Sequence, residues 1–235
     1  MLKEKISPEN LSEFLKYLSS MECPEGNNRL PALADLSKEL GISIASLREQ
    51  LEVARALGLV EVRPKTGIRR LGYTFRPAVT QSLSYALAVT PELFKSFSDL
   101  RNHIEAAYWY EAVTLLTSED HQRLRELIAQ AQSKLRGHPV QIPHAEHREL
   151  HLLVYQRLGN PFVSGILESY WEMYEAVGLA VYTDFAYLEK VWQYHERMVE
   201  AIVAGDYNAG YQALHEHADM LYQRSRPILS RQKFE

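Results

Sequence analysis

The chain has 235 residues, 46% of them hydrophobic and 24% charged, which is enough for one large core or for a small domain joined to a larger one. A single cysteine, Cys23, excludes a disulfide framework, and no apolar run is long enough to span a bilayer. No run of signal-peptide character opens the sequence, so we expect a soluble protein of the cytoplasm with no membrane partner.

The charged residues are distributed unevenly along the chain. The net charge of −4 argues against a general nucleic-acid binder. Residues 1–80, however, carry 12 Lys and Arg against 10 Asp and Glu, whereas residues 81–235 carry 14 against 20. Between Arg48 and Arg76 there are seven basic residues and only three acidic ones. The sequence therefore predicts a locally basic segment on an acidic body.

The first part of the chain has the pattern of helices followed by a hairpin. Apolar spacing predicts one helix over residues 8–20 and two more over 33–40 and 45–57, separated by a short turn that contains glycine. The runs LVEV and IRRL flank PKTG, a Pro and Gly turn typical of a tight hairpin. We expect a winged helix-turn-helix domain over residues 1–72.

The rest of the chain reads as a connection followed by helices. Residues 73–89 are weakly patterned and contain Pro77, so we assign them to the linker. A helix is predicted to open at Thr90-Pro91 and another to be capped by Ser118. Four further helices are expected over residues 144–158, from 160, over 184–205 and over 206–226. The expected fold is mainly α, with an all-α helical bundle over residues 90–235.

Short motifs stand out in both expected domains. Those of the first are Leu30-Pro31, Leu36, Leu40-Gly41-Ile42-Ser43, Leu47-Arg48-Glu49, Leu51, Gly58-Leu59-Val60 and Gly67. Those of the second are Arg101 with Glu105, His151, Gly159-Asn160-Pro161, His195, Ala201-Ile202, Gly205-Asp206 and His217. Together they resemble the winged helix-turn-helix of GntR-family transcription regulators and the ligand-sensing domain of their FadR-like (FCD) subfamily. The resemblance covers nearly the whole chain and implies a regulator that binds operator DNA.

Three positions depart from the family pattern. Ile44 stands where the family often has Arg, and Ser46 where it often has Pro. In metal-binding members an Asp lies four residues before the first His of the sensor domain, and His147 holds that position here. The first two differences bear on the operator sequence, and the third bears on the metal ligands.

The expected DNA contacts lie at the start of the recognition helix and at the wing tip. Arg48 is placed to make a bidentate contact with guanine in the major groove. Ser43 and Ser46 begin the helix, where hydroxyls and free backbone N–H groups can donate to phosphate. Lys65 and Gly67 are expected to reach the adjacent minor groove.

A simpler interpretation of the basic residues is surface ion pairing. Arg48 and Arg55 could pair with Glu52 and its neighbours, and helical periodicity alone favours that interpretation. The helix-turn-helix, the hairpin and the local basicity together favour DNA binding instead. One small winged domain offers few phosphate contacts, so we expect a homodimer on a pseudo-palindromic operator.

Four of the nine histidines are candidates for a metal site. His147 and His151 are four residues apart and share a helix face, while His195 and His217 belong to two later helices. For any one of them a surface or hydrogen-bonded core position is the simpler interpretation. The resemblance implies that His151, His195 and His217 bind a metal, with His147 in place of the usual Asp. Four imidazoles favour borderline ions, so we expect zinc first and nickel second.

Arg101 and Glu105 share a face of the first sensor helix, where the simpler interpretation is an intrahelical salt bridge. The resemblance implies that Arg101 approaches an effector cavity. We expect it to bind the carboxylate of a small organic acid that also chelates the metal. An all-histidine site leaves the charge of the ion uncompensated, which strengthens the attraction for an anionic effector.

These expectations describe a ligand-responsive, DNA-binding transcriptional regulator, expected to be a repressor and not an enzyme. A metal-dependent hydrolase with a fused helix-turn-helix is one alternative, but it needs a carboxylate base. Neither Glu146 nor Glu149 is in register with His147 and His151. The other alternative is a purely structural metal that stabilises the helical bundle and has no part in ligand sensing.

Overall fold

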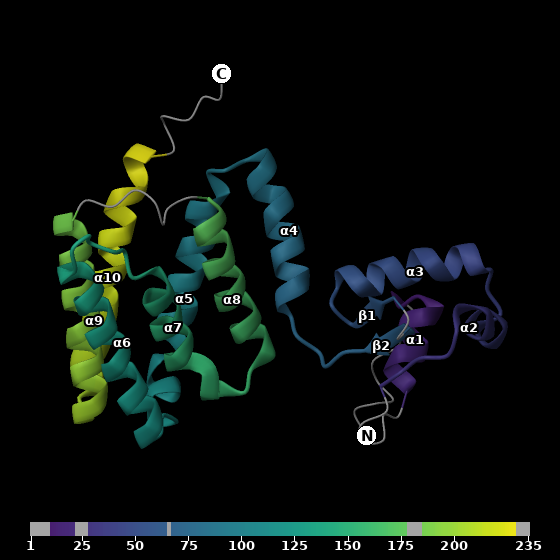
Figure 1. Ribbon diagram of the computed structural model, residues 1–235, viewed down its shortest axis with the longest axis horizontal. Coiled ribbons are helices and arrows are strands. Elements are labelled where there is room, and N and C mark those ends of the chain that lie inside the picture. Colours follow the sequence, from purple (N-terminus) through teal and green to yellow (C-terminus); the bar gives the residue numbers. More distant parts are fainter. Residues whose placement is uncertain (1–9, 22–27, 65–66, 178–184, 229–235) are drawn as a thin grey trace. The chain divides into compact units, whose positions relative to one another are not determined.

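The chain forms two compact units, residues 1–81 and 82–235 (Figure 1). The computed structural model describes residues 10–21, 28–64, 67–177 and 185–228. Within these ranges, no helix combines the length and apolar character needed to cross a membrane.

The described residues of the first unit that precede α4 (Arg76–Val89) form three α-helices and a two-stranded hairpin. In chain order these are α1 (Glu13–Ser20), α2 (Leu33–Leu40), α3 (Ile44–Ala56), β1 (Val60–Arg63) and β2 (Gly67–Arg70). The predicted order of helix, helix-turn-helix and wing is confirmed, with α2 at its predicted bounds and α3 shifted by one residue. The first helix begins five residues later than predicted, because the Ser12 side chain caps it by accepting a hydrogen bond from the Leu15 N–H.

Two local features fix the helix-turn-helix. Gly41 ends α2 with a φ of 66°, a left-handed conformation that a residue with a Cβ adopts only at a cost. Ser43 then caps α3 by accepting a hydrogen bond from the Ser46 N–H. The core beneath these helices consists of apolar side chains, among them Phe14, Leu36, Leu47, Leu51, Ala54, Val60 and Ile68.

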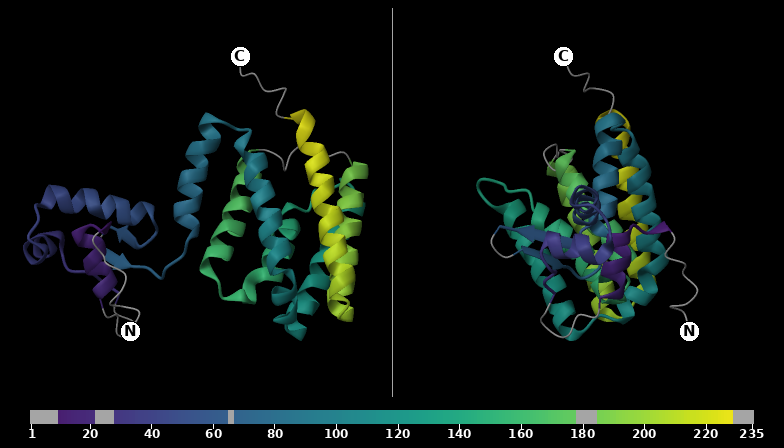
Figure 2. Two further views of the ribbon diagram at one scale, coloured as in Figure 1. Left: turned by 180° about the vertical axis from the view of Figure 1, so that it is seen from behind. Right: turned by 90° about the vertical axis from the view of Figure 1, so that its right-hand side faces the viewer.

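The second unit is helical in its described residues. Its helices are α4 (Arg76–Val89, entering from the first unit), α5 (Leu93–Thr114), α6 (Ser118–Arg136), α7 (His144–Tyr155), η2 (Gln156–Leu158), α8 (Pro161–Ala176), α9 (Phe185–Ala204) and α10 (Tyr207–Ile228). Helix α7 packs against α5, α6 and α8, whereas α10 packs along α9 and against α5. Figure 2 shows α9 and α10 side by side. Residues from α5, α7, α9 and α10 therefore meet inside this bundle.

The structure differs from the sequence predictions at three further helix starts. Most of the segment assigned to the linker is helix α4, because Pro77 lies in its first turn, where a missing N–H is tolerated. Helix α5 begins at Leu93, and Thr90-Pro91 forms the turn before it. The N-cap of α6 is Thr117 and not Ser118, because Thr117 and Asp120 form a capping box.

Candidate metal centre and nucleic-acid interface

Four histidine side chains converge inside the second unit. His147 and His151 come from α7, His195 from α9 and His217 from α10. One nitrogen of each ring lies within 4.8 Å of one nitrogen of every other. The Nε2 atoms of His151 and His195 are 3.0 Å apart. The structure thus brings together the four histidines that the sequence singled out.

Hydrogen bonding does not account for these rings. His147 Nε2, His195 Nδ1 and both ring nitrogens of His217 are buried without a hydrogen-bond partner among the described residues. Buried polar atoms nearly always have a partner, so these atoms require another explanation. Burial lowers the pKa of each of the four rings well below its usual value, and nearby positive charge lowers it further. The rings are therefore neutral and offer lone pairs, as metal binding requires.

A buried ion pair from α5 lies against the cluster. Arg101 Nη2 is 2.8 Å from Glu105 Oε1, and each side chain is only 1% exposed. The same Nη2 is 2.7 Å from His151 Nδ1, and Glu105 Oε1 is 3.3 Å from that nitrogen. Burial raises the pKa of Glu105 to about 7, although the charge of Arg101 lowers it. The salt bridge considered from the sequence is present, but it lies in the interior.

Aromatic rings of α8 cover the other side of Arg101. Its guanidinium lies 4.9 Å from the ring centroid of Tyr170 and 5.4 Å from that of Trp171, within range of cation–π attraction. The Trp171 ring also contacts His147, with centroids 4.6 Å apart. Arg101 Nε and Trp171 Nε1 are buried donors with no hydrogen-bond partner among the described residues. Donors of this kind suit an oxygen-rich ligand.

The recognition helix exposes the arginine expected to read bases. Arg48 is exposed and forms no hydrogen bond or ion pair within the described part of the chain. Arg55, by contrast, pairs with Glu52 at 2.6 Å. The ion-pair interpretation thus holds for Arg55 and not for Arg48.

The other residues predicted to contact DNA lie around Arg48 and in the wing. Ser43 and Ser46 form the capped start of α3, so their hydroxyls lie beside its first N–H groups. Gly67 begins β2 with a φ of 81°. Lys65 lies outside the described residues.

Comparison with known proteins identifies the family. The model of the FCD domain matches residues 97–220, more than half of the chain. This chain belongs to the GntR family of transcriptional regulators and carries an FCD domain. All four histidines and Arg101 lie within the residues that match the FCD domain.

Individual relatives agree with this assignment. The HTH-type transcriptional regulator YieP of Escherichia coli K12, itself uncharacterized, is 23% identical over 192 residues, which cover 78% of this chain and 80% of YieP. The solved structure of Streptococcus agalactiae GntR superposes with a TM-score of 0.62 at 18% identity, covering 92% of this chain and 99% of that one. At that identity the second likeness supports the fold alone.

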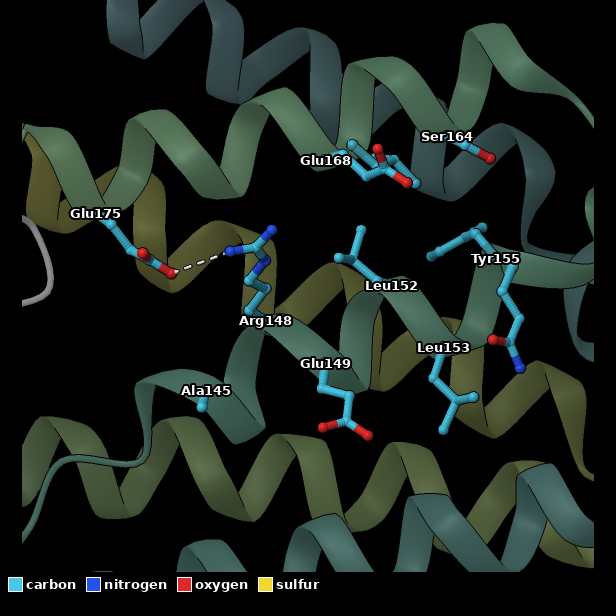
Figure 3. Close-up of a pocket in the computed structure, with 11 residues that line it drawn as sticks. Ala145, Arg148, Glu149, Leu152, Leu153, Tyr155, Ser164, Glu168 and Glu175 are labelled. Carbon is cyan, nitrogen blue, oxygen red and sulfur yellow. Dashed lines mark ion pairs between the residues drawn. The ribbon is translucent and has the colours of Figure 1, made fainter. Parts of the chain in front are cut away.

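A cavity of about 550 Å³ lies between α7 and α8 of the FCD domain (Figure 3). Its lining includes Arg148, Leu152, Glu168 and Glu175, with Arg148 and Glu175 joined by an ion pair at 3.7 Å. None of the four clustered histidines is among its lining residues. Helix α7 therefore directs one face toward this cavity and another toward the histidine cluster.

The contact of Glu105 with His151 was not predicted from the sequence. The sequence paired Glu105 with Arg101 alone, whereas the structure places its carboxylate beside His151 as well. The two residues are on different helices, and spacing along the chain gives no signal of their contact. Trp171 is both buried and in contact with the cluster.

Proposed function

We propose that this GntR-family regulator is a metal-dependent sensor of a small carboxylate. His147, His151, His195 and His217 hold one zinc or nickel ion in the FCD domain. The observation that carries the proposal is the convergence of four buried, neutral imidazoles, four of whose eight ring nitrogens are buried without a hydrogen-bond partner among the described residues. A bound divalent ion would take one nitrogen of each ring as a ligand and supply a Lewis-acidic site for an anionic oxygen.

Charge arrangement supports a carboxylate as the effector. The four rings add no negative charge, and the charges of Arg101 and Glu105 offset each other. A divalent ion at the histidines would therefore leave excess positive charge in a buried place, which favours an anion. Arg101 lies against His151 and is the residue that we assign to the effector carboxylate.

We assign DNA reading to the start of α3 and to the wing. Arg48 contacts guanine, and Ser43 and Ser46 donate to phosphate. Lys65 and Gly67 reach the adjacent minor groove. The protein acts in the cytoplasm as a homodimer that represses from a pseudo-palindromic operator. Residues 1–72 bind DNA, 73–89 connect the domains and 90–235 sense and dimerise.

The effector releases DNA through a coupling between the two ligands. Linkage then requires operator DNA to weaken effector binding by the same factor as the effector weakens DNA binding. Identical effector affinities with and without operator would contradict this mechanism.

The first test is the metal content of the untagged protein. We expect about one zinc or nickel ion per chain in the wild type, lost in His151→Ala because the ion then has three protein ligands in place of four. His144→Ala is the matched control, since His144 lies on the same helix but outside the cluster. Wild-type protein that holds no ion after reconstitution with zinc or nickel would overturn the proposal.

The near-complete burial of the cluster also favours a second function, a metal that only stabilises the bundle. Such an ion would stabilise the folded state by binding it preferentially. Chelation would then lower the melting temperature, while small carboxylates would leave operator affinity unchanged.

A further inference from the structure

We propose that His151 exchanges its hydrogen-bond partner when the ion binds. Its Nδ1 accepts from Arg101 in the metal-free protein and donates to Glu105 in the loaded protein, which makes Glu105 a positioning residue for the metal centre. The exchange releases Arg101 toward a carboxylate. This inference rests on the proposed function and extends it, because it states how the metal site and Arg101 are coupled.

Two competing groups reach the same nitrogen. Arg101 Nη2 lies 2.7 Å from His151 Nδ1, and Glu105 Oε1 lies 3.3 Å from it. A guanidinium only donates hydrogen bonds, and an ionised carboxylate only accepts them. His151 Nδ1 therefore pairs with Arg101 when it carries a lone pair and with Glu105 when it carries a proton.

Whether His151 Nδ1 carries the proton determines whether Nε2 does. A neutral imidazole carries one proton, so a lone pair on Nδ1 places the proton on Nε2. That tautomer suits the 3.0 Å distance to His195 Nε2, which can accept the hydrogen bond. It leaves no lone pair on Nε2, the atom of His151 that faces His195. His151 can therefore bind an ion through Nε2 only in the tautomer protonated on Nδ1.

The carboxylate of Glu105 can accept a hydrogen bond from the His151 tautomer that is protonated on Nδ1. Neither of its oxygens accepts a hydrogen bond from a described residue, although Oε1 is ion-paired with Arg101. A carboxylate that accepts from the non-ligating N–H of a histidine fixes the ring and its tautomer for metal binding. The ring carries one proton before and after the exchange, so the ring itself releases none.

The exchange changes what Arg101 can bind. It removes the hydrogen bond from Nη2 to His151 but leaves the one from Nη1 to the Asn102 side chain, at 3.1 Å. Arg101 Nε has no partner among the described residues even before the exchange. Nη2 keeps its ion pair with Glu105 but has a second N–H, so Nη2 and Nε can then both donate to one carboxylate. An ion at the histidines and a carboxylate at Arg101 therefore favour each other.

The tautomer of His151 can be read directly by NMR. Long-range ¹H–¹⁵N spectra of the full-length protein, labelled at histidine nitrogens, are recorded at pH 8 without metal and with one equivalent of zinc. The His151 signals are assigned by their loss in His151→Gln. We expect a proton on Nε2 without metal, and a proton on Nδ1 with a metal-shifted Nε2 in zinc. The same His151 tautomer in both samples would overturn the exchange.

Zinc affinity of Glu105 variants, measured by competition with a chelator, tests the positioning role. Glu105→Leu removes the acceptor and should weaken zinc binding by about 10–100-fold. Glu105→Gln keeps an acceptor oxygen and should recover most of that loss. Glu111→Leu, on the exposed side of the same helix, is the matched control and should leave the affinity unchanged.

The outcomes separate this inference from the proposed function. Wild-type protein that binds no zinc overturns both. Protein that binds zinc through the histidines with equal affinity in wild type, Glu105→Leu and Glu105→Gln overturns the exchange alone. If Glu105→Leu does not fold, a Glu105→Gln protein that retains zinc while His151 keeps its proton on Nε2 overturns it as well.

Discussion

The two units of this regulator place their polar residues in opposite locations. In the first unit the described core is apolar, and the arginines of α3 and the wing are exposed or partly so. In the FCD domain, charged and titratable side chains are buried, including Arg101, Glu105 and the four clustered histidines. Burying such groups costs free energy unless they are paired or bound to a ligand. One unit therefore carries its candidate function on the surface, and the other carries it in the interior.

The largest expected effect comes from breaking the buried ion pair. Arg101→Met leaves Glu105 in the interior without its partner, so the free energy of unfolding should fall by about 3–5 kcal/mol in urea denaturation. Adding Glu105→Leu should restore part of this loss. The surface pair of the first unit provides the contrast, because Arg55→Met should leave the free energy of unfolding nearly unchanged. Equal losses in Arg101→Met and Arg55→Met would contradict the comparison.

The next largest expected effect is a pH dependence of stability that arises from the buried groups of the FCD domain. The four histidines have a lower pKa in the folded state than in the unfolded chain. As the pH falls, the unfolded chain therefore binds protons at these rings before the folded protein does, and the free energy of unfolding decreases. Glu105 opposes this trend, because its folded pKa of about 7 lies above its unfolded value. From pH 7.5 to 5.5, protein kept in chelator should lose about 2–4 kcal/mol of unfolding free energy.

His195→Phe provides the control for this pH dependence. Removing one neutral, buried ring should reduce the slope of stability against pH by about half a proton on average in this range, and by more toward its acid end. A slope that is the same in wild type and His195→Phe would show that this ring does not remain neutral in the folded protein.

The comparison also shows which features a sequence can reveal. In the first unit, Ser43 as a cap and the PKTG turn are local signals, and local signals located α3 and the wing correctly. In the FCD domain, the four-residue spacing of His147 and His151 placed them on one helix face. Nothing in that spacing says that His195 and His217 face them, and only the family resemblance joined the set.

Two errors have different physical causes. Helix α4 was missed because Pro77 reads as a helix breaker, although a proline in the first turn of a helix costs little. The contact between Glu105 and His151 was missed because it joins α5 to α7, and side-chain contacts between helices depend on packing. Most features set by local propensity could thus be predicted, with α4 as the exception, whereas this contact set by helix packing could not.

The smallest expected effect concerns base reading by the exposed surface of α3. Ile44 and Ala45 are exposed at the first two positions of this helix, beside Ser43 and one turn before Arg48. Apolar side chains in the major groove contact the methyl group of thymine, whereas arginine reads guanine. We therefore expect duplexes selected from a random-sequence library to contain a guanine read by Arg48 and a thymine read by Ile44.

Replacing that thymine with deoxyuridine removes only the methyl group, so the two side chains can be separated. Wild-type affinity should fall by about 0.5–1 kcal/mol on this replacement, the order of one buried methyl group. Ile44→Ala should bind both duplexes equally, whereas Arg48→Ala should lose about 1–3 kcal/mol on either because its guanine contact is gone. If Ile44→Ala remains as sensitive to the methyl group as the wild type, another residue reads it, and Ile44 is only an exposed side chain of the surface.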